Sequence, residues 1–286
     1  LFEITVTILG YYDPIMGFVN PRVPPPSGTP IHIASDEMLG QVLCKLRPDE
    51  LGAVHIGSLL SRSRDAVPIA LDARGFTSTH MAIIASTGSG KSYLAGVVLE
   101  ELMRPHNRAA VLVIDPHAEY DTLTEMQGHP AFAQGGYAPE VKIVRPADIH
   151  VRVSSLEIAD LRYLLPNLSE RMHYLLGQAY GRVRRKYGEK WNRGQLCVAI
   201  REGLRGEPVT DPEADEDEDP TVGALIWRVN QVLEQSAIFD DNRNLPLPSL
   251  LRPGQCTVLQ LNEIPDREQQ IIVATLLRRL NQSRMD

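Results

Sequence analysis

The segment that most constrains the fold is Ser86-Thr87-Gly88-Ser89-Gly90-Lys91-Ser92, a run of small residues that ends in a lysine and a hydroxyl side chain. It follows an apolar run at residues 80–85 that is typical of a strand. Residues 93–102, which come next, carry apolar side chains at helical spacing. A strand, a glycine-rich loop and a helix in this order form the context in which such a run binds phosphate. The sequence therefore predicts a phosphate-binding loop, and the alternative is an ordinary turn that happens to contain a lysine.

The residue types of this loop predict a nucleotide site. Glycines let the backbone turn tightly, so that its N–H groups and the positive end of the following helix surround a phosphate group. Lys91 would reach the β- and γ-phosphate oxygens of ATP, and the Ser92 hydroxyl would ligate Mg²⁺. Ala85 stands where the usual pattern has its first glycine, and alanine fits there if its φ angle is negative. The predicted nucleotide-binding residues are Ser86, Thr87, Gly88, Ser89, Gly90, Lys91, Ser92 and Tyr93.

A second group of candidate site residues follows the apolar run at 111–114. Asp115 ends this run, and in open α/β sheets ligands bind beyond the carboxyl ends of the strands. We therefore expect Asp115 on the side of the phosphate loop, where it would hold Mg²⁺ through water or orient the loop. Glu119 would polarise a water molecule or contact DNA or a neighbouring subunit. The alternative for Asp115 is a turn-capping role, since an Asp-Pro pair favours turns.

The order of the apolar segments predicts an α/β fold in two parts. Residues 1–75 have short apolar runs separated by proline and glycine, which predicts a small β-barrel. Residues 76–286 alternate between strand and helix patterns, which predicts a parallel sheet with strands at 109–115, 141–144 and 255–261. Helical spacing dominates residues 154–240, and we expect a helical insertion there, with Ser154 or Ser155 as its first cap. A last helix is expected over residues 267–280.

Charge is concentrated in two segments. The formal net charge is −7, and seven acidic residues lie between Asp211 and Asp219, so the remainder of the chain is neutral. Because that acidic run has almost nothing to bury, we expect it to be an exposed loop. A basic run at residues 182–190 fits either a nucleic-acid contact or a solvated helix end, and the helix end is the favoured interpretation.

The hydropathy of the chain and its first residues predict where in the cell the protein is located. No apolar run approaches the roughly 18–20 residues that cross a membrane. No secretory leader is evident, so we expect a cytoplasmic protein without membrane contact. The chain does not begin with methionine, and we expect it to be part of a longer protein.

The loop at residues 86–92, combined with Ile114-Asp115-Pro116-His117-Ala118-Glu119-Tyr120, resembles the HerA branch of the FtsK–HerA P-loop ATPases. The order of the predicted modules agrees over nearly the whole chain. The resemblance implies a RecA-like ATPase core, with Lys91, Asp115 and Glu119 as catalytic residues and Ser92 and Asp115 at the metal. It also implies a catalytic glutamate and an arginine reaching a neighbouring subunit, both of which we expect beyond Asp286.

The resemblance implies a homo-hexameric ring that moves along double-stranded DNA using ATP and Mg²⁺. Such rings work with a NurA-type nuclease in DNA-end resection, or with effector proteins in antiviral defence. Two alternatives stay open. One is a nucleotide-binding ring that scaffolds a nuclease or effector with little motor activity, and the other is a conjugation-type ATPase at a membrane.

Overall fold

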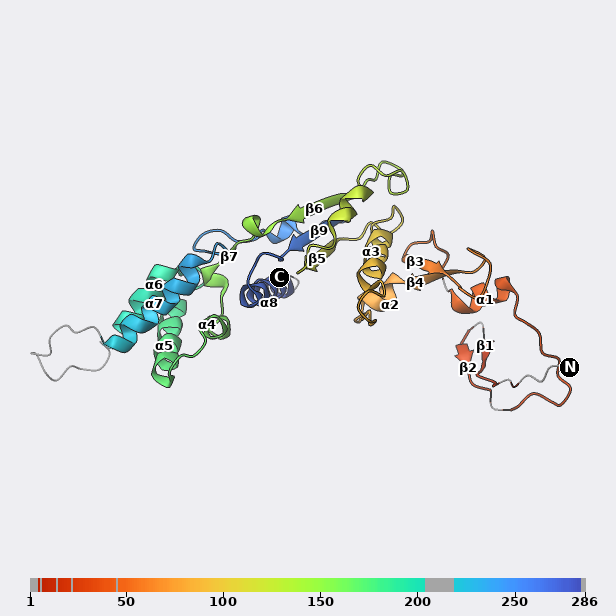
Figure 1. Ribbon diagram of the computed structural model, residues 1–286, viewed down its shortest axis with the longest axis horizontal. Coiled ribbons are helices and arrows are strands. Elements are labelled where there is room, and N and C mark those ends of the chain that lie inside the picture. The colour runs from red at the N-terminus through yellow and green to blue at the C-terminus, as the bar shows by residue number, and fades with distance from the viewer. Residues whose placement is uncertain are drawn as a thin grey trace, which may run out of the picture. The chain divides into compact units, whose positions relative to one another are not determined.

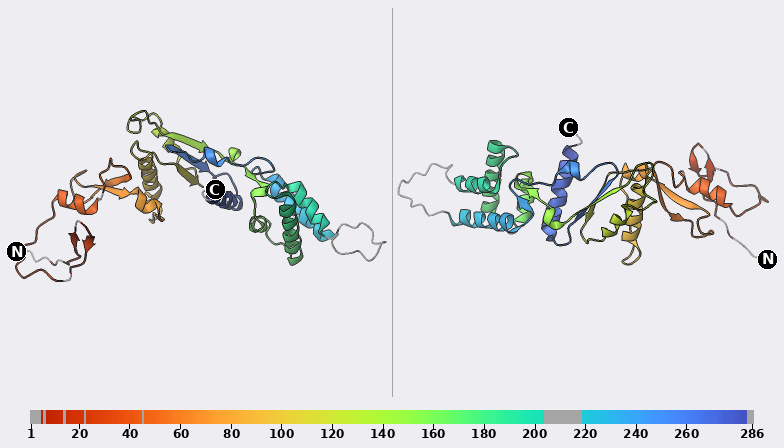
Figure 2. Two further views of the ribbon diagram at one scale, coloured as in Figure 1. Left: turned by 180° about the vertical axis from the view of Figure 1, so that it is seen from behind. Right: turned by 90° about the horizontal axis from the view of Figure 1, so that it is seen from above.

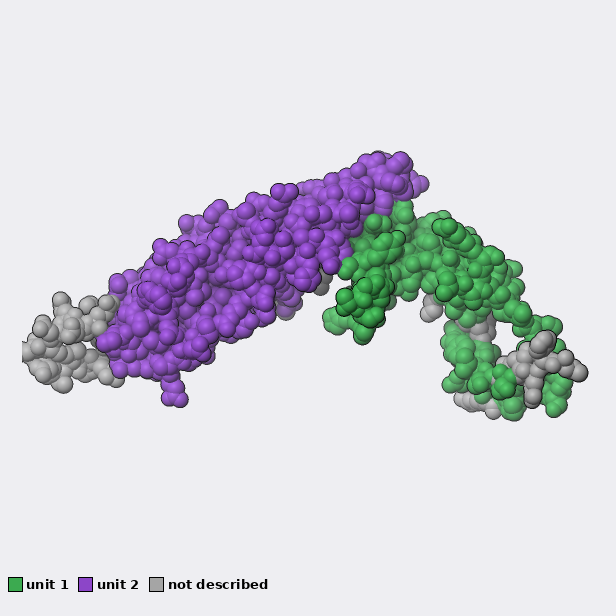
Figure 3. All heavy atoms as spheres, viewed as in Figure 1, with its two compact units in different colours: residues 1–107 green, residues 108–286 purple. Residues whose placement is uncertain are grey.

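The computed structural model describes residues 5, 7–13, 15–21, 23–44, 46–203 and 219–283. The chain divides into two compact units, residues 1–107 and residues 108–286, which Figure 3 shows in different colours. The acidic residues 211–218, which we expect to form an exposed loop, lie outside the described residues. The helices and strands are labelled in Figure 1.

The described residues of unit 1 form two antiparallel hairpins and three helices. Strands β1 (Tyr11–Asp13) and β2 (Gly17–Val19) pair with each other, and so do β3 (Ala53–Ser58) and β4 (Pro68–Asp72). The helices are α1 (Asp36–Leu43), α2 (Ala73–Thr77) and α3 (Lys91–Leu102). The described strands thus form two separate two-stranded sheets, and the closed barrel over residues 1–75 stays a prediction.

Side-chain hydrogen bonds connect α3 and the residues after it to the β3–β4 hairpin within unit 1. The Asn107 side chain accepts a hydrogen bond from Gly52 N at 2.8 Å and donates one to Ala53 O at 2.7 Å. The buried carboxylate of Glu101 on α3 accepts from His55 N at 3.1 Å. These bonds satisfy backbone groups at the start of β3 and hold the helix that follows the predicted phosphate loop.

Unit 2 is built on a parallel sheet, as predicted for an α/β protein. Its strands are β5 (Val111–Asp115), β6 (Glu140–Val144) and β9 (Gln255–Gln260), in the order β5-β9-β6. Every residue of the central strand β9 is buried, because it has a neighbour on each side. The three strands expected at residues 109–115, 141–144 and 255–261 are confirmed, with ends that differ by one or two residues.

Four helices are described between the short parallel strands β7 (Val151–Arg152) and β8 (Phe239–Asp240), in residues 153–203 and 219–238. They are α4 (Ile158–Leu164), α5 (Glu170–Tyr187), α6 (Arg193–Glu202) and α7 (Pro220–Gln235). Helices α5, α6 and α7 lie side by side in both views of Figure 2. The 3₁₀ turns of unit 2 are Asp121–Met126, Pro146–Asp148, Val153–Ser155 and Leu247–Ser249. That these helices are an insertion into an ATPase core stays a prediction.

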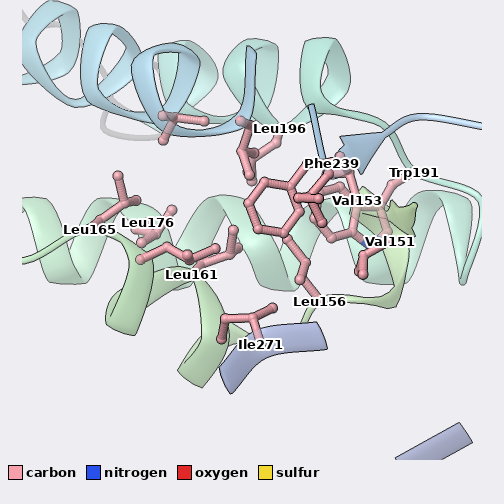
Figure 4. Close-up of a cluster of buried hydrophobic side chains, with 14 of the residues drawn as sticks. Val151, Val153, Leu156, Leu161, Leu165, Leu176, Trp191, Leu196, Phe239 and Ile271 are labelled. Carbon is pink, nitrogen blue, oxygen red and sulfur yellow. The ribbon is translucent and has the colours of Figure 1, made fainter. Parts of the chain in front are cut away.

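One hydrophobic core joins these helices to the sheet and to α8 (Asp266–Gln282). Figure 4 shows part of it, where Leu156, Leu161, Trp191 and Ile271 meet from different elements. The described helices contain no segment that is both apolar enough and long enough to cross a membrane.

Three sequence expectations need correction. Residues 80–85 form no strand, and Ile84 is 91% exposed, since this run has no hydrogen-bonded neighbour strand in unit 1. Residues 5 and 7–9, which belong to the range expected to form a β-barrel, are likewise in no strand. Ser154 and Ser155 lie in a 3₁₀ turn, and α4 is instead capped by Glu157 in a capping box with Asp160.

Candidate nucleotide-binding site

The loop at residues 86–92 has the backbone that phosphate binding requires. The φ angles of Gly88 and Gly90 are +78° and +91°, a region that favours glycine, whereas Ser89 between them has a negative φ. Alternation of this kind turns successive N–H groups toward one side and creates a concave surface that attracts anions. Around either glycine, a Cβ would meet nothing within 4 Å, so the space over the loop is open.

Helix α3 begins directly after this loop and adds its positive end to the site. Its N-cap is Gly90, no side chain caps it, and its first turn contains no acidic residue. The first N–H groups of a helix have no acceptor within the helix, and the helix dipole places partial positive charge there. The first bond of the helical ladder runs from Leu94 N to Gly90 O at 2.9 Å. The end of α3 is therefore suited to a negative ligand.

Lys91 and Ser89 close the loop on itself. The Lys91 ammonium donates to Ser86 O at 3.0 Å, and the Ser89 hydroxyl donates to the same carbonyl at 2.5 Å. A phosphate oxygen is a stronger acceptor than a carbonyl for an ammonium group, because it is charged. Lys91 thus lies over the loop with its charge at the position where a phosphate group would enter.

The remaining predicted loop residues are solvent-facing. The side chains of Ser86, Thr87, Ser92 and Tyr93 are exposed, Tyr93 by 79%. Ala85 has a negative φ, which meets the condition under which alanine replaces the first glycine of the pattern. The predicted nucleotide-binding residues from 86 to 93 therefore lie together in one exposed loop and helix start.

Asp115 lies at the carboxyl end of β5 in unit 2 and is only 1% exposed. Its carboxylate accepts from the backbone N–H groups of His117 (3.3 Å), Glu119 (3.2 Å) and Tyr120 (3.1 Å). These bonds shape the turn that follows the strand, in which Ala118 has a φ of +55°. Asp115 therefore caps a turn, with three of the roughly four acceptor sites of its carboxylate in use.

Two further polar residues at this edge of the sheet escaped the sequence analysis. Gln260 ends β9 directly opposite Asp115 in the register, and its side-chain amide donates to the carboxylate of Asp121. Because the strands are parallel, their carboxyl ends meet at one edge, where ligands bind in open α/β sheets. Gln260 could have been found from the sequence, because it is a polar residue at the end of a largely apolar strand pattern.

The structure places the predicted site residues in two groups. Ser86 to Tyr93 belong to unit 1, whereas Asp115 and Glu119 belong to unit 2. The geometry of each group is described within its own unit. That the two groups act together on one nucleotide is a proposal. Throughout the ranges that the structure describes, no three His, Cys, Asp or Glu side chains are grouped as ligands of a metal ion.

Residues 54–280 match the family model described as "Helicase HerA, central domain". The chain belongs to this family. The match includes the phosphate loop, Asp115 and Glu119, and it begins at the second residue of β3. The resemblance inferred from the two sequence motifs is thereby confirmed.

Individual relatives agree with this HerA assignment. The chain is 24% identical over 274 residues to a "DNA double-strand break repair helicase HerA" of Sulfolobus acidocaldarius, covering 94% of this chain and 50% of that protein. It is 44% identical over 100 residues to a "probable helicase" of Methanocaldococcus jannaschii, covering 35% of this chain and 18% of that protein. The chain thus spans half or less of the length of these relatives.

A solved structure, VirB4 of Thermoanaerobacter pseudethanolicus, aligns with a TM-score of 0.49 and 14% identity. The alignment covers 81% of this chain and 64% of that one. Its TM-score is below the level at which a shared fold is inferred.

Proposed function

We propose that this chain binds and hydrolyses ATP at the loop of residues 86–92. The observation that carries the proposal is the backbone of the loop: glycines with positive φ angles, open space above them, and the uncapped start of α3. Loops of this kind hold the β- and γ-phosphates of nucleotides. Membership of the HerA family supports ATP rather than another phosphate compound as the ligand.

In this proposal the loop residues bind and orient the nucleotide. Backbone N–H groups of residues 88–92 receive the phosphates, and Lys91 exchanges its bond with Ser86 O for a phosphate oxygen. Ser92 presents its hydroxyl to Mg²⁺, which would neutralise phosphate charge in the transition state. Asp115, whose oxygens accept three backbone N–H groups, would hold that metal through water or orient the loop. Glu119, on the same turn, would position water or contact DNA or another subunit.

The full protein would use this hydrolysis to move along double-stranded DNA as a homo-hexameric ring. The names of its HerA relatives, which describe helicases of double-strand break repair, support this activity. A NurA-type nuclease in DNA-end processing, or an effector protein in antiviral defence, would be its partner in the cytoplasm. The RecA-like core, the barrel at residues 1–75 and the helical insertion at residues 154–240 belong to the same proposal.

A ring that binds nucleotide but mainly scaffolds a nuclease or effector is the second candidate. Its nucleotide would bind at the same loop, where Lys91 bonds to Ser86 O at 3.0 Å. A motor predicts ATP hydrolysis that rises when DNA is added, whereas a scaffold predicts the same slow hydrolysis with and without DNA.

Replacement of Lys91 by alanine tests the nucleotide site. In the full-length protein, Lys91→Ala should lower ATP hydrolysis at least tenfold, about 1.4 kcal/mol of transition-state stabilisation, because a phosphate contact is lost. Lys190→Ala removes an exposed lysine of unit 2 and serves as the control. Hydrolysis at the parental rate by a folded Lys91→Ala protein would show that the loop is not the nucleotide site.

A further inference from the structure

Unit 2 contains a cavity of about 540 Å³ that is lined by none of the predicted nucleotide-site residues. Segments from β7, the turn after it, the end of α5, residues 244–247 and the last turns of α8 line it. Its charged lining residues are Arg152, Arg184, Arg278 and Arg279, with Glu157 and Glu189. Arg184 belongs to the basic run for which a solvated helix end was the favoured interpretation.

One of these arginines is neutralised by the protein itself. Arg278 forms an ion pair with the buried carboxylate of Asp160, and its Nε lies 3.6 Å from Glu157 Oε1. Arg278 therefore lies between two carboxylates, Asp160 and Glu157, and carries no free positive charge into the cavity. The positive charge of the cavity comes from the other three arginines.

Two of those three are fixed in place by neutral acceptors. Arg279 donates to the Asn244 side-chain oxygen at 2.9 Å and to Leu245 O at 2.7 Å. Arg152 donates twice to Asn242 O, at 3.1 and 2.8 Å. Each guanidinium has five N–H donors, of which these bonds use two, so both groups keep donors for a ligand.

The fixed arginines repel each other. Burial lowers the pKa of Arg279, and the positive charge of nearby Arg152 lowers it further. Within the described part of the chain, no carboxylate lies within 4 Å of the guanidinium of Arg152, Arg184 or Arg279. Four arginines and three acids, Asp160, Glu157 and Glu189, lie at the cavity or pair with its lining, which leaves one net positive charge. Like charges held together without a counter-ion are stabilised by an anion that enters between them.

We propose that this cavity binds a phosphate group of a nucleic-acid strand or of a nucleotide. Guanidinium forks match the oxygens of a phosphate group, and their positions are set before the ligand arrives. The hydroxyl and amide side chains of Ser154, Asn244 and Gln282 also line the cavity and add polar contacts. None of the described lining residues is aromatic, so the cavity recognises phosphate and does not stack a base.

This inference does not depend on the proposed function. The cavity uses residues of unit 2 that the phosphate loop does not contain, and it would bind phosphate whether or not the loop hydrolyses ATP. A DNA source and a nucleotide source share the same chemistry at the cavity, so separate arms of one experiment distinguish them.

The test compares Arg152→Gln/Arg184→Gln with a matched control, Arg185→Gln, in the full-length protein. Arg185 neighbours Arg184 on α5 but does not line the cavity. One arm measures the affinity for a short fluorescent DNA duplex over a range of salt concentrations. The other arm measures ADP binding by calorimetry in protein that also carries Lys91→Ala, so that binding at the loop is removed. Circular dichroism confirms that each variant is folded.

A DNA source predicts that the double variant loses about tenfold in affinity for the duplex and that the salt slope falls by about two, one for each lost phosphate contact. A nucleotide source predicts unchanged DNA affinity and loss of the ADP binding that remains in the Lys91→Ala background. Arg184→Gln alone, at an exposed position that folding tolerates, should give part of either loss. Identical binding by the double variant and Arg185→Gln in both arms would overturn the proposal.

Discussion

At the scale of single residues, Asp115 shows how one carboxylate serves a turn and a candidate site together. Its three backbone hydrogen bonds shape the turn at residues 116–120, and its position at the end of β5 places it where ligands bind in parallel sheets. The turn-capping and catalytic interpretations are therefore compatible. Rigid turns hold functional groups in place, so the capping bonds would also orient Glu119.

Replacing Asp115 with asparagine separates these two roles. Asp115→Asn keeps the shape of the side chain but exchanges an acceptor oxygen for an amide donor, which should reduce Mg²⁺-dependent ATP hydrolysis at least tenfold, or about 1.4 kcal/mol. The lost acceptor should also lower the free energy of unfolding by about 1–3 kcal/mol. Hydrolysis is measured over a Mg²⁺ titration, with the exposed Asp148→Asn as the control. Reduced stability with unchanged hydrolysis would leave Asp115 as a turn residue only.

The backbone conformation of the loop could be predicted from the sequence, whereas the side-chain hydrogen bonds of the site residues could not. Glycine at positions 88 and 90 indicates positive φ angles, because other residues are strained there, and both angles are positive. The bond from Lys91 to Ser86 O depends on which rotamer a long side chain adopts, and the pairing of Gln260 with Asp121 depends on the sheet order. Neither contact is encoded in local residue patterns.

At the scale of elements, an ion pair between helices holds part of unit 2 together. Asp160 on α4 is 5% exposed and pairs with Arg278 on α8, while the same carboxylate accepts from Glu157 N at 2.8 Å. A buried carboxylate without its partner is strongly unfavourable. The pair therefore fixes how α4 and α8 pack.

Arg278→Met should lower the free energy of unfolding by about 3 kcal/mol, because Asp160 would keep its charge without its partner. Urea denaturation of the purified protein measures this value. The double variant Asp160→Asn/Arg278→Met should recover part of the loss, since asparagine removes the buried charge and still accepts from Glu157 N. Equal stability of Arg278→Met and the parent would mean that the pair does not hold the helices.

Asp240, which ends β8 and begins the turn after it, carries a carboxylate that should make the stability of the protein depend on pH. Backbone N–H groups of Arg243 and Asn242, then the Arg243 side chain, lower the pKa of Asp240 from 3.8 to about 2. A carboxyl with a lowered pKa stabilises the folded state above pH 3.8, and this contribution is lost as the pH falls toward 2. The stability difference between the parent and Asp240→Asn should thus shrink over that range in urea denaturation series. A difference that stays constant with pH would show that Asp240 stabilises the turn only by its shape.

Segments with a regular apolar period were predictable from the sequence. Segments whose structure depends on pairing with a distant strand were not. The apolar patterns predicted α3, α8 and the three strands of the parallel sheet, and helical spacing over residues 154–240 predicted the region that holds α4 to α7. Asn192 and Gln195 form a capping box at the start of α6. The apolar run at residues 80–85 is typical of a strand, but a strand also requires a neighbour to pair with.

At the scale of the whole molecule, the two units assign the candidate site residues to different parts of the chain. The phosphate loop belongs to unit 1, and the parallel sheet with Asp115 belongs to unit 2. In the proposed ring, sites at subunit junctions would draw residues from more than one part of the assembly. The ring is therefore the proposal that assembly measurements test most directly.

Native mass spectrometry of the full-length protein should show six copies in one complex. Hydrolysis per subunit should rise steeply with protein concentration, because each site would need its neighbour to be complete. The two measurements are made on the same preparation, with and without double-stranded DNA. A monomer whose hydrolysis per subunit is independent of concentration would contradict the ring and the translocation mechanism that depends on it.

The order of strands in the parallel sheet also governs how the protein is made. Strands β5 and β6 do not pair with each other, and each obtains its hydrogen bonds from β9. Roughly 110 residues separate the end of β6 from the start of β9, and ribosomes add about 5–20 residues per second, so synthesis of this interval takes on the order of ten seconds. During that time both earlier strands are on the nascent chain without a partner. The newborn chain is thus open to wrong strand pairing until β9 emerges, and chaperone binding in this interval would protect it.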